Sequence, residues 1–335
     1  MRTRNLLAFA AATLVLAACS NDEVASDSLL PDDHAIRVTT QVGALQTRAG
    51  VETSTLTGFG MFVTNPNANS PYTYANTHWT KSGENWACAI PMLWQNATTS
   101  VGVLAYAPYD EAITAIKTDQ AFAVQANQSA TNGSDVVKSD LICAQATAVS
   151  PTTPGTNTDE VYYDASAKAL NLTFKHMMAK LKIEVTLGTE FNLIGENNAT
   201  VGNPITAIAM CGSKTSATWN MTTGAITSAG GAATDITPFA LSYTNATGTD
   251  ANATMTNGVA PYECILVPQT IETGNFFVSM TINGKTYIWT ATNAVKLDSG
   301  KLYVLKLTVG KEIVKVTGFS AGDWTDGTGS NLTTD

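Results

Sequence analysis

Hydrophobic and polar residues alternate along much of this chain, in short runs that end at Gly, Asn, Asp, Ser or Pro. In the first run, residues 36–42, one face carries Ile36, Val38, Thr40 and Val42. The other face carries polar residues, and this period of two predicts a β-strand. Similar runs recur as far as residue 309. Short strands with frequent turn signals predict an all-β protein made of β-sandwiches.

The clearest turn lies at Asn283-Gly284, because an Asn-Gly loop supplies the positive φ values of a type I′ turn. Outward from this turn, the predicted cross-strand pairs are Ile282 with Lys285, Met280 with Tyr287 and Val278 with Trp289. We expect this apolar, aromatic face to be buried. A second hairpin is predicted between residues 72–81 and 86–90. Helical patterns are weak, and the best candidates, residues 110–117 and 175–180, are too short to form a layer.

The N-terminus has the pattern of a targeting signal. Arg2 and Arg4 precede an apolar run over residues 6–18 that is too short to span a bilayer as a stop-transfer helix. The run ends in Leu-Ala-Ala-Cys, which is similar to a bacterial lipobox. This predicts cleavage between Ala18 and Cys19 and attachment of acyl chains to Cys19, which would hold the protein at a membrane. An ordinary signal peptide followed by a chance cysteine is the alternative.

An acidic stretch follows Cys19, over residues 20–34. Acidic residues at this position resemble the surface-export signals of some bacterial lipoproteins, which predicts exposure on the outer face of the outer membrane. A solvated linker is the alternative. The whole chain has 27 Asp+Glu against 18 Lys+Arg, a net charge of −9. Because no Lys/Arg cluster occurs either, nucleic acid is excluded as a partner.

Few residues of the chain are candidates for catalysis or metal binding. Besides Cys19 the chain has four cysteines, Cys88, Cys143, Cys211 and Cys264. Their spacing matches no zinc or redox motif, so disulfides and buried free thiols both stay open. The histidines, His34, His78 and His176, are not at metal-ligand spacing, and we expect His176 to pack or hydrogen-bond at a domain seam. No nucleophile or phosphate-loop motif occurs. We therefore predict no catalytic residues, no metal, no cofactor and no enzyme.

Several segments together resemble the fimbrillin family, the subunits of type V pili of anaerobic Gram-negative bacteria. Besides the lipobox they are residues 45–49 (Leu-Gln-Thr-Arg-Ala), 58–63, 103–109, 139–144, 172–183 (with Phe-x-His-x-x-Ala-Lys-Leu), 267–270 (Val-Pro-Gln-Thr), 299–303 and 323–324 (Asp-Trp). No single segment is specific. The match rests on their order over nearly the whole chain.

The resemblance implies two β-sandwich domains of transthyretin-like topology. The predicted organisation is a signal peptide over residues 1–18, a tether and propeptide over 19–48, an N-terminal domain over 49–167 and a C-terminal domain over 168–335. It further implies that an Arg-specific protease cuts between Arg48 and Ala49 and releases the strand with Ile36, Val38, Thr40 and Val42. A solvated loop arginine is the alternative for Arg48. A strand from the next subunit would then fill the open groove, because added strands pair free backbone and bury apolar side chains.

The candidate donor strand lies near the C-terminus and contains Ile313, Val314, Val316 and Phe319. Its alternation is shorter than a polymerising shaft subunit should supply, so shaft, tip and accessory roles all stay open. The predicted partners are other pilus subunits, the outer membrane, the protease and a host surface or glycan. The alternative function is a surface lipoprotein that binds glycan or host protein through its loops without polymerising.

Overall fold

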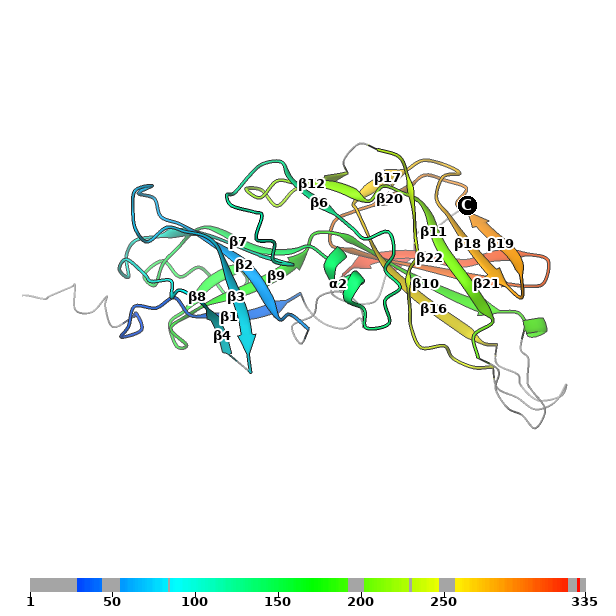
Figure 1. Ribbon diagram of the computed structural model, residues 1–335, viewed down its shortest axis with the longest axis horizontal. Helices are drawn as coiled ribbons and strands as arrows, with labels where there is room; N and C mark the ends of the chain where they lie inside the picture. Colours follow the sequence, from blue (N-terminus) through cyan, green and yellow to red (C-terminus); the bar gives the residue numbers. More distant parts are fainter. Residues whose placement is uncertain are drawn as a thin grey trace, which may run out of the picture.

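A computed structural model describes residues 29–43, 55–83, 85–191, 202–228, 231–246, 257–324 and 330–331. The regular structure of these residues is almost entirely β-strand, which confirms the all-β prediction. The molecule is elongated, with the blue and cyan strands of the N-terminal half at one end and the yellow to red strands of the C-terminal half at the other (Figure 1).

The N-terminal half forms an eight-stranded sheet. Its strands are β1 (Val38–Val42), β2 (Gly58–Thr64), β3 (Tyr74–Ser82), β4 (Asn85–Cys88), β5 (Val101–Ala107), β7 (Ile142–Val149), β8 (Val161–Asp164) and β9 (Ala169–His176). The strand order is β1-β9-β7-β5-β2-β3-β4, and β8 also pairs with β9. The pairing of β1 with β9 is parallel, whereas the other pairs in this sheet are antiparallel. The sheet curls, so that the Trp86 indole Nε1 on β4 donates to Thr40 Oγ1 on β1 at 3.1 Å.

The C-terminal half contains two larger sheets. The six-stranded sheet, in the order β15-β16-β10-β21-β22-β23, consists of β15 (Phe239–Ala240), β16 (Val259–Leu266), β10 (Ala179–Leu187), β21 (Lys301–Val309), β22 (Val314–Asp323) and β23 (Ser330–Asn331). The four-stranded sheet, in the order β14-β11-β18-β19, consists of β14 (Thr234–Ile236), β11 (Ile205–Ser213), β18 (Phe277–Ile282) and β19 (Lys285–Thr290). A small pair, β17 (Gln269–Ile271) with β20 (Val295–Leu297), and the 3-10 helix η1 (Thr189–Phe191) also belong to this half.

The hairpin of β18 and β19 forms as predicted. Its register pairs Ile282 with Lys285, Met280 with Tyr287 and Val278 with Trp289. Asn283 and Gly284 have φ values of 50° and 78°, the left-handed conformation that this turn requires. The predicted inner face is buried, while Ile288 on the outer face is 57% exposed.

The second predicted hairpin also forms, between β3 and β4, with Ser82 paired to Asn85. Neither predicted helix exists. Residues 175–180 are the end of β9 and the start of β10, and residues 110–117 form turns in which the Asp110 carboxylate accepts a hydrogen bond from the Ala112 amide at 2.9 Å. A short polar turn thus replaces the helix there, because the aspartate caps the backbone locally.

The chain passes from the first sheet to the second at Met177 and Met178. The predicted boundary between residues 167 and 168 would assign β9 to the C-terminal half, yet β9 pairs with β1, β7 and β8. Only two residues separate β9 from β10, so the sequence pattern contains no linker to mark the change. We place the division between the halves at Met177-Met178.

The halves interlock through residues 120–140. Strand β6 (Gln120–Ala123) pairs with β12 (Ser216–Trp219), which pairs with β13 (Ile226–Ser228), so that this small sheet joins both halves. The buried Gln128 side chain hydrogen-bonds the backbone of Ile265 on β16, at 2.8 Å to Oε1 and 2.9 Å from Nε2. Residues 124–140 are rich in Ser, Asn and Gln, yet they form a seam between the halves.

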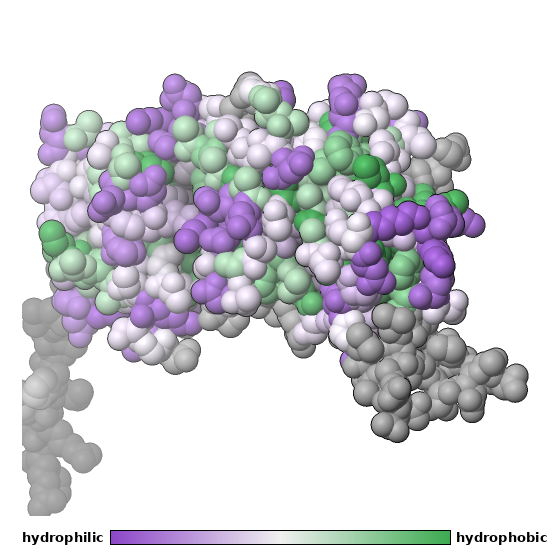
Figure 2. Space-filling view, turned by 45° about the vertical axis from the view of Figure 1, so that its right-hand side comes forward, coloured by the Kyte–Doolittle hydropathy of each residue, from purple (hydrophilic) through white to green (hydrophobic). Residues whose placement is uncertain are grey.

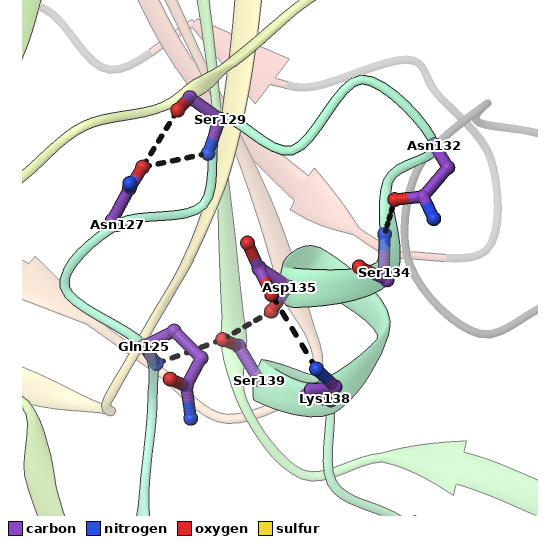
Figure 3. A network of polar contacts seen from close by, with 8 residues as sticks. All are labelled: Gln125, Asn127, Ser129, Asn132, Ser134, Asp135, Lys138 and Ser139. Carbon is purple, nitrogen blue, oxygen red and sulfur yellow. Dashed lines mark hydrogen bonds and ion pairs between the residues drawn. The ribbon is translucent and has the colours of Figure 1, made fainter.

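One short helix, α2 (Ser134–Ser139), lies within this seam segment (Figures 1 and 3). Figure 3 shows how side chains hold it: the Ser134 amide donates to Asn132 Oδ1, and Ser139 Oγ accepts from the Gln125 amide at 2.9 Å. Lys138 pairs with Asp135 one turn away. Short polar side chains therefore fix a segment whose sequence resembles an open loop.

Large hydrophobic side chains rarely reach the surface of the described residues. The exposed ones are Ile90, Leu93, Ile116, Ile288 and Ile313. On the face seen in Figure 2, polar and weakly apolar residues are mixed, and strongly hydrophobic residues occur in small separate groups. No helix among the described residues is long and apolar enough to cross a membrane.

The turn between β21 and β22 folds against the edge strand β19. Lys285 Nζ donates to the Lys311 carbonyl at 2.8 Å and pairs with Glu312 at 3.2 Å. The Tyr287 hydroxyl donates to the same carbonyl at 3.1 Å. One strand of the four-stranded sheet is thus tied to the six-stranded sheet at its outer edge.

Candidate functional site: the N-terminal strand and its groove

Strand β1 lies at one edge of the N-terminal sheet and buries its apolar face in the core of that half. Ile36, Val38 and Val42 are 4%, 8% and 6% exposed, while Arg37, Thr39 and Gln41 are exposed. This alternation matches the face predicted from the sequence. Burying apolar side chains of this size contributes about 1.5 to 3 kcal/mol each before ordering costs.

The backbone of this segment is bound on two sides. Its parallel ladder with β9 runs from Val38 opposite Leu170 to Val42 opposite Phe174. Upstream of β1, the Ile36 amide donates to the Met92 carbonyl at 2.8 Å, and the Trp94 amide donates to the His34 carbonyl at 2.8 Å. Residues 34–43 are therefore held by neighbours that are distant in sequence, and residues 38–42 form the strand.

A separate anchor holds the chain further upstream. Leu30 is 1% exposed and belongs to the hydrophobic core of the N-terminal sheet. The Tyr163 hydroxyl donates to the Leu29 carbonyl at 2.5 Å, and Lys168 Nζ donates to the Leu30 carbonyl at 2.8 Å. A tyrosine hydroxyl is protonated at neutral pH, and burial raises the pKa of Tyr163 further. No sequence motif marks Tyr163 or Lys168, because both side chains bind main-chain atoms.

The residues predicted for processing lie outside the described part of the chain. These are Ala18 and Cys19 at the lipobox, and Arg48 and Ala49 at the predicted propeptide cleavage. Described structure ends at Gly43, whose amide donates to the Phe174 carbonyl at 2.9 Å, and resumes at Thr55. The connection from β1 to the rest of the fold thus runs through the stretch that contains Arg48.

The candidate donor residues lie at the start of β22. Ile313 precedes the strand and is 54% exposed, Val314 and Val316 are half-buried, and Phe319 is 6% exposed. A register shift opposite Lys306 and Leu307 bulges the strand after Val316. The bulge lets Val314, Val316 and Phe319 pack on the same core, although simple alternation would put Phe319 on the opposite face.

The end of β22 meets the end of β9 at the seam. His176 stacks on Trp324 with ring centroids 3.8 Å apart, and its Nδ1 lies 3.0 Å from the buried Asp140 carboxylate. A cavity of about 390 Å³ adjoins this stack and is lined also by Gly43 at the end of β1. The prediction that His176 packs and hydrogen-bonds at a seam is therefore confirmed.

The four described cysteines are free thiols. Cys143, Cys211 and Cys264 are buried, and burial raises the pKa of each, to about 12 for Cys143 and Cys211. Cys88 is half-buried on β4, and its pKa is raised by the same cause. The alternative of buried free thiols is thus the one observed.

Two carboxylates border a surface groove of about 600 Å³ next to β7. Glu160 accepts from Lys175 at 2.8 Å and from the Gln145 amide at 3.1 Å, and Asp159 accepts from the Thr156 amide at 2.7 Å. The side chains that line this groove include no aromatic ring. Within the described residues, no group of three or more His, Cys, Asp or Glu is arranged to hold a metal ion.

Residues 47–324 match a protein-family model described as fimbrillin-like. The chain belongs to the fimbrillin-like family. The match starts just before Arg48 and ends at Trp324, so it spans both halves of the fold. Membership gives this fimbrillin-like protein a structural role in cell-surface fimbriae rather than an enzymatic one.

Solved structures share the fold. A proposed cell adhesion protein from Bacteroides uniformis superposes with a TM-score of 0.56 at 19% identity, covering 87% of this chain and 98% of that one. A second, from Bacteroides ovatus, gives a TM-score of 0.60 at 18% identity, with 87% and 97% coverage. Comparison with curated proteins finds no significant match. At these identities the structural likeness establishes the architecture alone.

Proposed function

We propose that this fimbrillin-like protein is a pilus subunit that joins its neighbours by donor-strand exchange after cleavage at Arg48. One observation carries the proposal: β1 is an edge strand with its apolar face buried, and its onward connection contains Arg48. A cut there would leave β1 bound only by non-covalent contacts. Its loss would uncover unpaired β9 backbone and an apolar groove, which another strand can repair.

The energetics favour a durable joint. Leu30, Ile36, Val38 and Val42 are the buried apolar side chains of the segment. Together they correspond to about 6 to 12 kcal/mol of burial before ordering costs. A donor strand with comparable side chains would recover the same free energy. The exchanged subunits would then stay together without any covalent bond.

The composition of the chain makes cleavage unusually selective. Its only arginines are Arg2, Arg4, Arg37 and Arg48. Arg2 and Arg4 lie in the predicted signal peptide. Arg37 lies between two anchored segments, its side chain pairs with Asp33 at 3.0 Å, and its carbonyl accepts the Leu170 amide at 2.8 Å. An Arg-specific protease should therefore cut the native precursor at Arg48 alone.

The experiment treats purified precursor with an Arg-specific protease and identifies fragments by mass spectrometry. We expect a cut after Arg48, retained in Arg37→Ala and lost in Arg48→Ala. Detergent-resistant ladders would then identify a self-polymerising shaft subunit. Capture of only a cognate fimbrial subunit would identify a tip or accessory role. Strand exchange is ruled out if Arg48 stays uncut in the native protein, or if the cut protein accepts no strand. The function would then be that of a surface lipoprotein that binds glycan or host protein through its loops.

We also propose that Cys19 bears the acyl chains that anchor the precursor at the outer membrane, with the body of the protein exposed on the cell surface. The support is the lipobox over residues 16–19. Labelled fatty acid should be incorporated into the wild type and not into Cys19→Ala. Label retained by the variant would refute the lipid anchor.

A further inference from the structure

The upstream anchor of the N-terminal segment differs in chemistry from the β1 ladder. Strand β1 is bound by main-chain pairing with β9, whereas residues 29 and 30 are bound by two side-chain donors and a buried leucine. The donors are the Tyr163 hydroxyl at the end of β8 and the Lys168 ammonium just before β9. We call Tyr163 and Lys168 the carbonyl clamp.

The local structure positions both donors. Tyr163 is 2% exposed and packs edge-to-face against Trp94, with ring centroids 5.7 Å apart. Lys168 follows a tight turn in which Asp164 Oδ1 accepts the amides of Ser166 and Ala167, at 2.8 and 3.2 Å. Each contact limits the directions in which the clamp side chains can point.

The backbone of Lys168 is itself unusual. Its φ is +50°, a left-handed conformation that costs free energy in a residue with a side chain. Glycine would adopt this φ without strain. A lysine at a position that favours glycine indicates that its ammonium has a role, and its hydrogen bond is the one to the Leu30 carbonyl.

We propose that the carbonyl clamp and the buried site occupied by the Leu30 side chain form a second subsite for the incoming donor strand. This subsite would bind two consecutive main-chain carbonyls and one apolar side chain of that strand. Such a subsite presupposes the strand exchange proposed above. If the N-terminal segment leaves, a buried hydroxyl and an ammonium lose their acceptors, at a cost that a new strand can offset. Main-chain carbonyls supply acceptors whatever the donor sequence, so specificity would come from the apolar residue.

The occupant is therefore a segment of another subunit that continues past the β1 ladder and turns, as residues 31–34 do where the His34 amide donates to the Pro31 carbonyl at 2.9 Å. It must place an apolar side chain upstream of the alternating residues that replace Ile36, Val38 and Val42. A strand that covers only the β1 ladder would leave the clamp unfilled. It would bind more weakly and dissociate faster, because affinity differences at one interface lie mostly in the dissociation rate.

The test separates the clamp from natural processing. A recognition sequence for a sequence-specific protease is placed within residues 44–54 of the full chain, so that the segment is freed whether or not Arg48 is a natural site. Fluorescent peptides of residues 29–43 and 34–43 are then exchanged into the cut protein. Their dissociation is followed by anisotropy in wild type, Tyr163→Phe, Lys168→Gln and Lys168→Gly.

We expect the long peptide to dissociate roughly 5- to 30-fold faster from each clamp variant than from wild type, the effect of one or two lost hydrogen bonds. The short peptide should dissociate equally fast from all proteins. Tyr162→Phe on the same strand and Lys138→Gln on α2 serve as matched controls. Lys168→Gly should fold at least as stably as wild type and still lose the long peptide faster.

Three results would overturn the clamp. These are long-peptide rates unchanged in the clamp variants, short-peptide rates changed equally, or no binding of either peptide to the cut protein. Failure of natural cleavage at Arg48 would refute the proposed function without affecting the peptide result. Strand exchange that proceeds normally in Tyr163→Phe and Lys168→Gln would refute the clamp but not the proposed function.

Discussion

Lys180 and Glu263 form an ion pair inside the C-terminal half, on the neighbouring strands β10 and β16. Their Nζ and Oε2 atoms are 2.8 Å apart, and both side chains are buried. Lys180 Nζ also lies 5.7 Å from the centre of the Trp324 ring. Such a pair adds little net stability, because removing two charges from water offsets their attraction, but breaking it leaves a buried charge without its counter-charge.

Lys180→Met should therefore lower the free energy of unfolding by about 3 to 5 kcal/mol. The double variant Lys180→Met, Glu263→Leu should recover most of that loss. Urea titration followed by tryptophan fluorescence measures both. A single variant as stable as wild type would show that the pair is solvated in solution.

Thiol reactivity gives a second prediction at this scale. The thiolate is the reactive form, and burial raises the pKa of all four described thiols, so each stays protonated at neutral pH. Cys88 alone among them is partly accessible. With a Cys19→Ala background, a maleimide should label one site in the native protein, which Cys88→Ser removes, and labelling should speed up as pH rises. Fast labelling of Cys143, Cys211 or Cys264 would show that the native core opens.

At the scale of elements, the β18–β19 hairpin shows how far a local pattern can specify structure. An added Cβ at Gly284 would meet no atom within 4 Å, so only the backbone conformation requires glycine there. Gly284→Val should cost about 1 to 3 kcal/mol of stability through strain at positive φ. Gly284→Asn, which tolerates this φ better, is the control. Thermal unfolding measures both, and equal melting temperatures for wild type and Gly284→Val would contradict the turn assignment.

Local patterns predicted this hairpin and the alternation of β1, because turn chemistry and period-two burial act over a few residues. They could not predict that β1 pairs with β9 in parallel, since its partner follows more than a hundred residues later and pairing direction leaves no mark on alternation. The structure has the division after β9 rather than before it, because β9 pairs with β1, β7 and β8, and alternation does not show which sheet a strand joins. Tyr163 and Lys168 have no sequence signature at all.

At the scale of the whole molecule, Gln128 joins the halves by acting as a strand partner for Ile265. Its amide accepts from the Ile265 amide and donates to the Ile265 carbonyl, and it is fully buried. Gln128→Ala would leave both backbone groups without these bonds. We expect a loss of about 2 to 4 kcal/mol in stability.

Hydrogen exchange locates this effect. The Ile265 amide should exchange faster in Gln128→Ala, while amides of β1 and β9 change little. Gln120→Ala, at a partly exposed position on β6, provides the control. Unchanged protection at Ile265 would show that the halves are held together elsewhere.

The turn between β21 and β22 that folds against β19 also bears on unwanted association between copies of the chain. In the assembly proposed above, copies with open strand edges would meet one another before they join, and Ile288 on the outer face of β19 is 57% exposed. Lys285 sets a charge at the start of that strand and, with Tyr287, ties it to Lys311. If chains join by strand exchange as proposed, an edge tied in this way would be a poor template for unintended pairing with another copy.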